Sequence, residues 1–323
     1  MSGTPTIPAP NSGSQWHRWD PHIHAPGTHL NNQFPGTDAW EQYLTKIEQA
    51  SPVLAALGIT DYCSLTSYEN LVAEKAKGRL NQVQLVFPNV EMRLAIGTVK
   101  GKYVNIHLLI CPDHPNHVED AKRFMNLLKF EVDGDTFACN DSDLTRLGKH
   151  SDNSLNGTAA LSEGVEQFKV ELSNLRDAFK KSKWAGENIL IGVAGAETDG
   201  SSGVRDGADA TMRTEIEKFA HVIFSSSPAQ RKFWLGNGTA TPRELEEKYG
   251  GPKPCIHGCD AHDLPKVGVP DGDRFTWVKG LVAFDTLRQA LIDPKGRAFV
   301  GPQPPISTIP SQAISSIEIA GAP

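Results

Sequence analysis

Short, almost continuously apolar segments recur along this chain, and stretches with a helical period separate them. Such segments are typical of strands that are buried on both faces, as in a parallel sheet covered by helices. Strands that alternate with helices predict an α/β sheet or barrel. The predicted strands are Trp19–His24, Val53–Thr60, Val83–Leu94, Tyr103–Ile110, Ile189–Ala194, His221–Ser225, Cys255–Gly258, Gly280–Phe284 and Ala298–Val300.

Helical patterns lie between several of these strands. Thr37–Gln49 places its large apolar side chains on one stripe, and Tyr68–Gly78 reads as a second helix. A third helix is predicted to open with Thr241 as its N-cap and Pro242 at its first position. The two glycines of 97–102 predict a hairpin between the strands on either side.

The chain of 323 residues suits one barrel, with additions to it. Residues 1–15 read as a disordered leader, and 16–301 as the barrel. Within the barrel, 113–187 reads as an insertion with one strong helix, Ala160–Lys181. Residues 302–323 read as a Pro-rich linker and the start of a strand, either truncated or a docking segment.

Composition limits the class of protein. No apolar run is long enough to cross a bilayer, and the N-terminus lacks the apolar core of a secretory signal, so we expect no membrane partner. Five cysteines argue against a disulfide framework and for a cytoplasmic location. Cys255 and Cys259 lack a second pair and are expected to be buried cysteines rather than zinc ligands.

The net charge of −6 bears on nucleic acid as a partner. Proteins that hold nucleic acid by their own surface are usually basic. Many of the acidic side chains here are candidate metal ligands, however, and bound cations would reverse the local field. The charge therefore weakens a nucleic-acid interpretation without excluding it.

Histidines and carboxylates stand where the predicted strands end. His22 and His24 close the first strand and, being two residues apart, point to the same side. Asp61 ends the second strand, and Glu91 follows the apolar start of the third. These ends are where α/β barrels place their sites.

Two further segments complete the pattern. His107 lies within the strand Tyr103–Ile110, and Asp260 and His262 follow Cys255–Gly258 with the spacing of the opening histidine pair. Each residue has a simpler interpretation: a turn cap for Asp61, an ion pair with Arg93 for Glu91, a core histidine for His107. Together they predict a metal site, because such groups are costly to bury unless they are paired or metal-bound.

These motifs resemble the polymerase-and-histidinol-phosphatase (PHP) domain, most closely the N-terminal PHP module of TrlF-like PHP–ATPase fusion proteins. The matching segments span about Trp16 to Gly301, from 16-WHRWDPHIH-24 through 58-GITDY-62 and 88-PNVEMRL-94 to 257-HGCDAH-262. The resemblance implies a distorted (β/α)7 TIM-like barrel with two or three zinc, manganese or iron ions.

The resemblance also implies roles for the matching residues. His22 and His24 would bind a first metal, Glu91 would bridge two metals and His107 would hold a second ion. Asp260 and His262 would complete the first and third sites, and Asp61 matches an acidic family position. His22, Glu91 and Asp260 are the candidate catalytic residues among these ligands.

The chain departs from the family at two points. Tyr62 stands where many members have a histidine, which leaves the third metal open or shifts a ligand to His29. At the fifth strand the best candidate ligand is Glu197, with His221 as a rival that is expected to face away from the site. His257 is a candidate ligand or substrate contact.

The implied activity is that of a metal-dependent phosphoesterase, a hydrolase in which a metal-activated water attacks the phosphorus of a phosphate ester. Arg93 is a candidate contact to the phosphate. The resemblance to ATPase fusions favours a nuclease that works with an ATPase domain or separate subunit, whereas the acidic charge favours a small phosphomonoester. An amidohydrolase is disfavoured by Glu91 and by the Asp260–His262 ending, and a catalytically inactive regulatory module remains an alternative.

Overall fold

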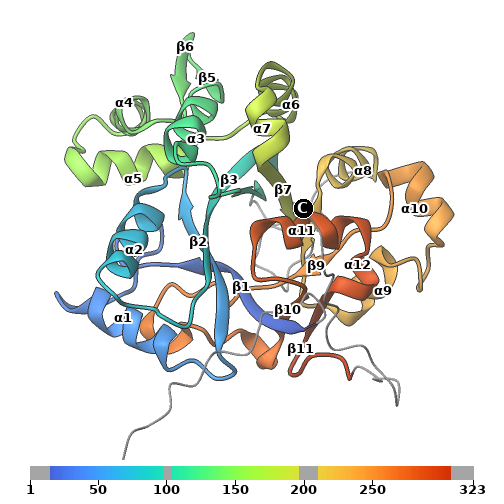
Figure 1. Cartoon of the computed structure of the whole chain (residues 1–323). Helices are drawn as coiled ribbons and strands as arrows, with labels where there is room; N and C mark the ends of the chain where they lie inside the picture. The colour runs from blue at the N-terminus through green and yellow to red at the C-terminus, as the bar shows by residue number, and fades with distance from the viewer. Residues whose placement is uncertain (1–14, 98–102, 196–209, 307–323) are drawn as a thin grey trace, which may run out of the picture.

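The computed structural model describes residues 15–97, 103–195 and 210–306, and its main element is a mixed, barrel-shaped sheet (Figure 1). The sheet has nine strands in the order β11-β10-β1-β2-β3-β4-β7-β8-β9, and its end strands β9 and β11 lie close enough that it is nearly closed. The strands are β1 (Trp16–His24), β2 (Leu54–Tyr62), β3 (Leu85–Gly97), β4 (Tyr103–Ile110), β7 (Ile189–Ala194), β8 (Val222–Phe224), β9 (Cys255–Ile256), β10 (Phe275–Lys279) and β11 (Ala298–Gly301). The predicted α/β barrel class is confirmed, although with nine strands instead of seven.

Pairing within the sheet is parallel along β1-β2-β3 and β7-β8-β9, and antiparallel elsewhere. The predicted hairpin is confirmed by the antiparallel ladder of β3 and β4, which pairs Glu91 with His107. The helices around the barrel are α1 (Ala39–Glu48), α2 (Thr66–Ala76), α8 (Ala210–Phe219), α9 (Pro228–Trp234), α10 (Pro242–Tyr249), α11 (Phe284–Ile292) and α12 (Pro294–Arg297).

The start of α10 follows the local sequence signals. The Thr241 hydroxyl accepts the backbone N–H of Glu244, the Glu244 carboxylate accepts the backbone N–H of Thr241, and Pro242 occupies the first turn. Gly250 ends the helix in the left-handed conformation. The predicted cap is therefore confirmed.

One predicted strand is wrong. Gly280–Phe284 forms a turn and the start of α11, and the strand lies earlier, at β10. Gly280 has a φ of 147°, which few other residues adopt, and a Cβ there would lie 2.6 Å from the Thr286 side chain. The turn directs the chain away from the sheet, so the apolar residues after it pack as a helix.

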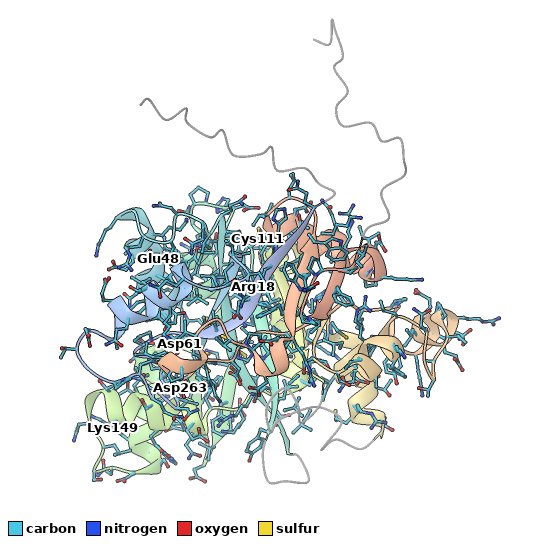
Figure 2. The ribbon with its side chains drawn as sticks, turned by 90° about the horizontal axis from the view of Figure 1, so that it is seen from below. Arg18, Glu48, Asp61, Cys111, Lys149 and Asp263 are labelled. Carbon is cyan, nitrogen blue, oxygen red and sulfur yellow. The ribbon has the colours of Figure 1, made fainter. Side chains whose placement is uncertain are left out.

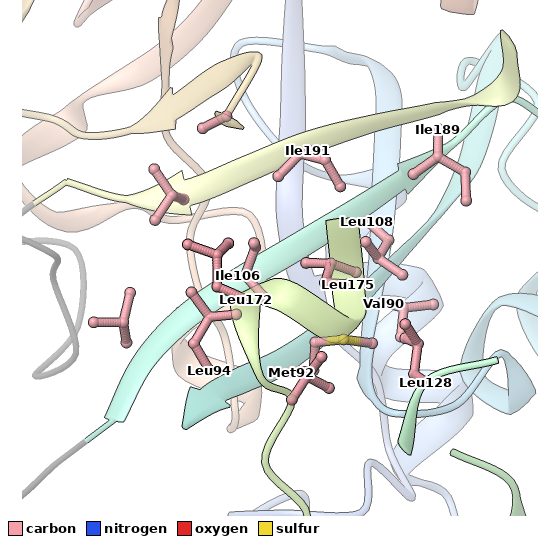
Figure 3. Close-up of a cluster of buried hydrophobic side chains, with 14 of the residues drawn as sticks. Val90, Met92, Leu94, Ile106, Leu108, Leu128, Leu172, Leu175, Ile189 and Ile191 are labelled. Atoms are coloured by element: carbon pink, nitrogen blue, oxygen red, sulfur yellow. The ribbon is translucent and has the colours of Figure 1, made fainter. Parts of the chain in front are cut away.

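Residues between β4 and β7 form a layer of helices on one side of the barrel (Figure 1). The layer contains α3 (His117–Met125), the hairpin β5 (Lys129–Val132) and β6 (Asp135–Ala138), α4 (Asp141–Ser151), α5 (Gly157–Gln167), α6 (Leu172–Lys181) and α7 (Lys183–Asn188). Its apolar side chains share one core with β3 and β4: Leu128, Leu172 and Leu175 face the sheet's Met92, Leu94 and Ile106 (Figure 3).

The single helix predicted at Ala160–Lys181 is wrong in one respect. The structure has two helices there, α5 and α6, with an extended segment at Phe168–Glu171 between them. The backbone N–H of Val170 donates to Arg93 O, and the N–H of Ala95 donates to Val170 O. This pairing with the open edge of β3 outweighs the local helical preference of the segment.

A buried arginine, Arg18, links two loops to the barrel near the start of β1. Arg18 of β1 donates to the backbone oxygens of Pro52 and Gly268 and lies 4.0 Å above the Phe275 ring. Figure 2 shows Arg18 within the body of the molecule and Lys149 of α4 at its outer edge. Arg18 thus ties β1 to loops more than thirty residues away in the sequence.

All five cysteines are buried and none forms a disulfide, as expected for Cys255 and Cys259. Among the described residues, no helix is both long and apolar enough to traverse a bilayer. The predicted leader (apart from Gln15) and the predicted strand near the C-terminus lie outside the described residues.

His221 provides a test of the packing behind β7. Its Nδ1 accepts the backbone N–H of Ile191 at 2.9 Å, and burial, aided by the charge of Lys253, lowers its pKa to about 4. The unfolded chain, with an ordinary histidine pKa of about 6.5, therefore binds more protons between those values. We expect the free energy of unfolding to fall as pH drops from about 6.5 towards 4, and less steeply in His221→Asn, which keeps an acceptor.

Chemical denaturation at pH 7, 6 and 5 measures both slopes. We expect the change in the free energy of unfolding with pH to differ between the parent protein and His221→Asn by up to about 1.4 kcal/mol per pH unit. His150→Asn, on the outer surface of α4, is the matched control. Equal slopes for the parent protein and His221→Asn would show that His221 does not resist protonation.

Candidate metal centre

Six predicted side chains from four separate segments come together at one mouth of the barrel. His22 and His24 come from the end of β1, Glu91 from β3 and His107 from β4. Asp260 and His262 come from the loop that follows β9. The ring and carboxylate atoms form two groups that could each hold a metal ion: His22 with His24 and Asp260, and His22 with Glu91 and His107.

The spacing of the donor atoms suits a small divalent ion. His22 Nε2 lies 3.3 Å from His24 Nε2 and from Glu91 Oε2, and 3.2 Å from Asp260 Oδ1. His24 Nε2 lies 3.3 Å from Glu91 Oε2 and 3.5 Å from Asp260 Oδ1. Four ligands placed tetrahedrally about 2.0–2.1 Å from an ion are themselves about 3.3–3.4 Å apart. The observed spacings therefore match the edges of such a coordination shell.

The chemistry of these atoms also fits a cation. Two imidazole Nε2 atoms face each other at 3.3 Å, where at least one must present a lone pair without a proton. Glu91 Oε1 accepts a hydrogen bond from Asn105, but Glu91 Oε2 is buried and has no hydrogen-bond partner in the described parts of the chain. Such an oxygen is costly to bury unless a cation compensates for it.

Asn89 orients His107. Its Oδ1 lies 3.1 Å from His107 Nδ1, while its amide nitrogen donates to Pro21 O at 2.9 Å and to the Thr60 hydroxyl at 3.0 Å. These donations fix the orientation of the amide, so its oxygen accepts a hydrogen bond from His107 Nδ1–H. The other ring nitrogen of His107 is then left as a bare ligand.

Asp61 lies behind the ligand cluster rather than in it. Thr28 lies between Asp61 and His24: its hydroxyl is 3.2 Å from His24 Nδ1 and donates to Asp61 Oδ1 at 3.1 Å. The hydroxyl therefore accepts a hydrogen bond from His24 Nδ1–H, so Nε2 is the nitrogen that His24 can offer to a metal. Asp61 Oδ2 accepts from the Ser67 hydroxyl, so both oxygens are occupied. Asp61, predicted as a ligand, is in neither ligand group and reaches His24 only through Thr28.

Aromatic stacking orders the side of the centre where a third ion was considered. The His24 ring stacks on two aromatic neighbours, His262 with ring centroids 4.1 Å apart and Tyr62 with centroids 4.9 Å apart. The Tyr62 hydroxyl lies 3.5 Å from His262 Nε2. His29 Nδ1 pairs with Asp61 at 3.2 Å. Tyr62 thus contacts His262, and His29 contacts Asp61. Neither Tyr62 nor His29 belongs to either ligand group.

The Asp260 loop is held against β1 by a buried carboxylate. Asp20 accepts the backbone N–H of Cys259 at 3.2 Å and that of His22 at 3.3 Å. Between them, Gly258 allows close approach, because a Cβ there would lie 2.4 Å from His22 O. Asp260 itself has a φ of 47°, an uncommon value that turns its carboxylate towards the histidines.

Of the three remaining predicted site residues, two are in neither ligand group and one lies outside the described residues. Arg93 forms an ion pair with Glu166 of α5 at 2.6 Å. The backbone of His257 is held by Thr276, and His257 is in neither ligand group. His221 faces away from the centre, as expected. Glu197 lies outside the described residues.

Sequence reasoning missed the residues that orient the ligands, namely Asp20, Thr28 and Asn89. Asn89 sits beside Glu91 and Asp20 beside His22, so adjacency to a ligand was a usable signal for both. No local signal marks Thr28, whose role depends on Asp61 being brought to it from the next strand.

The electrostatics of the centre favour either protons or a cation. Burial by itself lowers the pKa of His24, but hydrogen bonds to Asp260 and Glu91 outweigh it and raise the pKa to about 9. Burial would raise the pKa of Glu91, but the two histidines hold it below its usual value. Burial lowers the pKa of His107 to about 3. The two carboxylates therefore require positive charge beside them, from imidazolium or from a metal.

Comparisons with known proteins add little to this geometry. Neither a family model nor a curated protein matches the sequence. Among solved structures, one similar chain is a Bifidobacterium adolescentis protein provisionally described as a metal-dependent phosphoesterase. The alignment has a TM-score of 0.39 and 14% sequence identity, and it covers 86% of this chain and 97% of that one. At this level the likeness carries no argument, so the interpretation rests on the residues themselves.

Asn89 is predicted to support metal binding through His107. Asn89→Ala removes the acceptor of His107 Nδ1–H, which frees the ring to rotate and to change tautomer. We expect a loss of roughly 10–100-fold in affinity for Zn²⁺ or Mn²⁺, measured by calorimetric titration. Asn126→Ala, on the outer surface of the helical layer, is the control. Unchanged affinity in a folded Asn89→Ala protein would refute the role.

Metal affinity should also rise with pH. Because the pKa of His24 is about 9 without a metal, the ring carries a proton at pH 7 that a metal must displace. Each displaced proton makes the apparent affinity rise by up to about tenfold per pH unit below that pKa. Titration with Mn²⁺ between pH 6 and 8, in buffers of different ionisation enthalpy, measures both affinity and proton release. If the histidine rings are already neutral in the metal-free protein, neither the apparent metal affinity nor the number of protons released should change with pH.

Proposed function

We propose that the chain is a metal-dependent phosphoesterase. The observation that carries the proposal is the position of two imidazole nitrogens, from His22 and His24, which lie 3.3 Å from each other and 3.2–3.5 Å from carboxylate oxygens of Glu91 and Asp260 at the mouth of a barrel. Mixed histidine and carboxylate ligands suit zinc, manganese or iron better than magnesium. The resemblance of the sequence to PHP domains supports the same conclusion.

Most of these residues would bind the metal ions, and one side of the centre is open to substrate. His22, His24, Glu91 and Asp260 are the proposed ligands of a first ion, and His107 with Glu91 and His22 those of a second. Divalent ions held there would neutralise a phosphate ester and make a bound water acidic enough to attack phosphorus. The Asp260 side chain is 43% exposed, so the centre is open to substrate on that side.

Among substrates, we propose a nucleic-acid phosphodiester, with an ATPase domain or subunit as the working partner. Support comes from the resemblance to PHP–ATPase fusions, because a coupled ATPase implies a polymer to act on. The net charge of −6 argues for a small phosphomonoester instead.

One observation keeps an inactive, regulatory metal module as the second candidate. Tyr62 takes the place beside His262 where a further histidine would complete a third site, and its hydroxyl is 3.5 Å from His262 Nε2. A module of this kind would bind metal and stabilise a partner without turnover.

Hydrolysis by metal-loaded protein tests the proposal. Manganese-loaded protein is expected to hydrolyse p-nitrophenyl phosphate or bis(p-nitrophenyl) phosphate, and single-stranded or double-stranded DNA or RNA. His22→Ala removes a residue shared by both ligand groups, so kcat/KM should fall by about 10³-fold or more. Lys180→Gln, on the surface of α6, is the control.

The pattern of outcomes separates the candidates. Hydrolysis of p-nitrophenyl phosphate with intact DNA and RNA would replace the nuclease with a phosphomonoesterase. Bound metal with equal, background turnover in the parent protein and His22→Ala would indicate the regulatory module. Absence of bound metal in the parent protein would remove the proposal altogether.

A further inference from the structure

The inner face of β3 continues beyond the metal centre. Asn89, Glu91 and Arg93 alternate along one face of this strand, and Asn105 and His107 of β4 pair with Arg93 and Glu91. Arg93 therefore lies one strand repeat, about 6.7 Å, further towards the mouth than the ligand Glu91. A group bound at Arg93 would be a neighbour of a group bound at the metals.

Beyond the end of β2, the extended segment between α5 and α6 pairs with the edge of β3. β2 pairs with β3 only as far as Tyr62 and Glu91, and Val170 bridges Leu94 beyond that point. The Val170 side chain is buried in the core beneath the helical layer. Because side chains alternate along extended backbone, Lys169 points to the opposite face, beside Arg93.

Two like charges thus lie side by side on neighbouring strands, an arrangement that is destabilising unless an anion lies between them. Lys169 is only 7% exposed, and its Nζ lies 4.8 Å from the centre of the Tyr103 ring. Nζ donates to the backbone oxygen of Glu166, and no carboxylate of the described residues lies within ion-pair distance of it. The Glu166 carboxylate binds Arg93 instead, at 2.6 Å.

We propose that Arg93 and Lys169 form a subsite for a second phosphate of the substrate, and that Glu166 covers this subsite when substrate is absent. The inference deepens the proposed function and rests on it, since the first phosphate is the one at the metal centre. Arg93 offers a planar pair of donors and Lys169 a point charge, both of which suit phosphate oxygens.

The surroundings support an anion from outside the chain. Burial, together with the charge of Arg93, lowers the pKa of Lys169 to about 8, although the carboxylates of Glu166 and Glu163 act in the opposite direction. Glu166 is 49% exposed and can move into solvent without burying its charge. The second phosphate could belong to the next link of a nucleic-acid strand or to a small bisphosphorylated molecule, and the two sources share the same chemistry.

Matched ligands that differ by one phosphate test the subsite by binding alone. The first pair is a hydrolysis-resistant phosphorothioate dinucleotide with and without a 5′-phosphate; the second is fructose 1,6-bisphosphate and fructose 6-phosphate. Calorimetric titration of the full-length, manganese-loaded protein gives the ratio of the two Kd values in each pair. A preference of about tenfold or more for the second phosphate is expected in at least one pair.

Substitutions then assign the preference to its residues. Lys169→Gln should reduce the ratio to about one, Lys169→Arg should keep it, and Glu166→Gln should increase it several-fold because the internal carboxylate no longer competes. Lys180→Gln removes an equal charge from α6 and should leave the ratio as it is. Thermal melts of each variant confirm that the fold is retained.

The outcomes separate this inference from the proposed function. No preference in either pair, or an undiminished preference in folded Lys169→Gln, would overturn the subsite even if the protein hydrolyses phosphate esters. A preference that depends on Lys169 supports the subsite, and the pair in which it occurs identifies the source of the phosphate. Failure to hydrolyse any of the phosphate esters named above, nucleic acid included, would refute the proposed function while the Kd ratios still decide the subsite.

Discussion

The meeting of two imidazole nitrogens with two carboxylates at the barrel mouth is the constraint on which the rest of the site depends. The Nε2 atoms of His22 and His24 lie 3.3 Å apart, and each lies within 3.5 Å of a carboxylate oxygen of Glu91 and one of Asp260. Such groups are stable together only with positive charge among them. The arrangement therefore fits a cation site. The surrounding hydrogen bonds hold the side chains of that site in their orientations.

Those surrounding bonds come partly from strands and partly from loops. Asn89 orients His107 from β3, and Asp61, at the end of β2, acts on His24 through Thr28 of the loop after β1. The Asp260 loop is tied to β1 by the buried Asp20 and by the close approach at Gly258. A site whose ligands are fixed in this way keeps its geometry when a ligand enters or leaves.

The helical layer contributes both to stability and to the site. It closes the apolar outer face of β3 and β4, where Met92 and Ile106 would otherwise be exposed. Its extended segment also places Lys169 beside Arg93, next to the mouth. The pairing of this one extended segment with β3 therefore both adds to the apolar core and places Lys169 beside Arg93, because successive residues of a strand face opposite sides.

The sequence by itself determined the fold class and most strand positions, and it predicted the side chains that meet at the barrel mouth, namely His22, His24, Glu91, His107, Asp260 and His262. These are readable because apolar runs of strand length mark the barrel and because polar ligands follow directly at their ends. Local chemistry also sufficed for the α10 cap, where Thr241, Pro242 and Glu244 act within one turn.

Only the tertiary structure decided what depends on contacts between distant residues. Asp61 has the same local setting as a ligand, yet Thr28 stands between it and His24. The break between α5 and α6 arises from hydrogen bonds to β3, and the strand at β10 in place of Gly280–Phe284 from pairing with β1. Such outcomes rest on which partner a backbone or side chain meets in space, and no local pattern of residues encodes that partner.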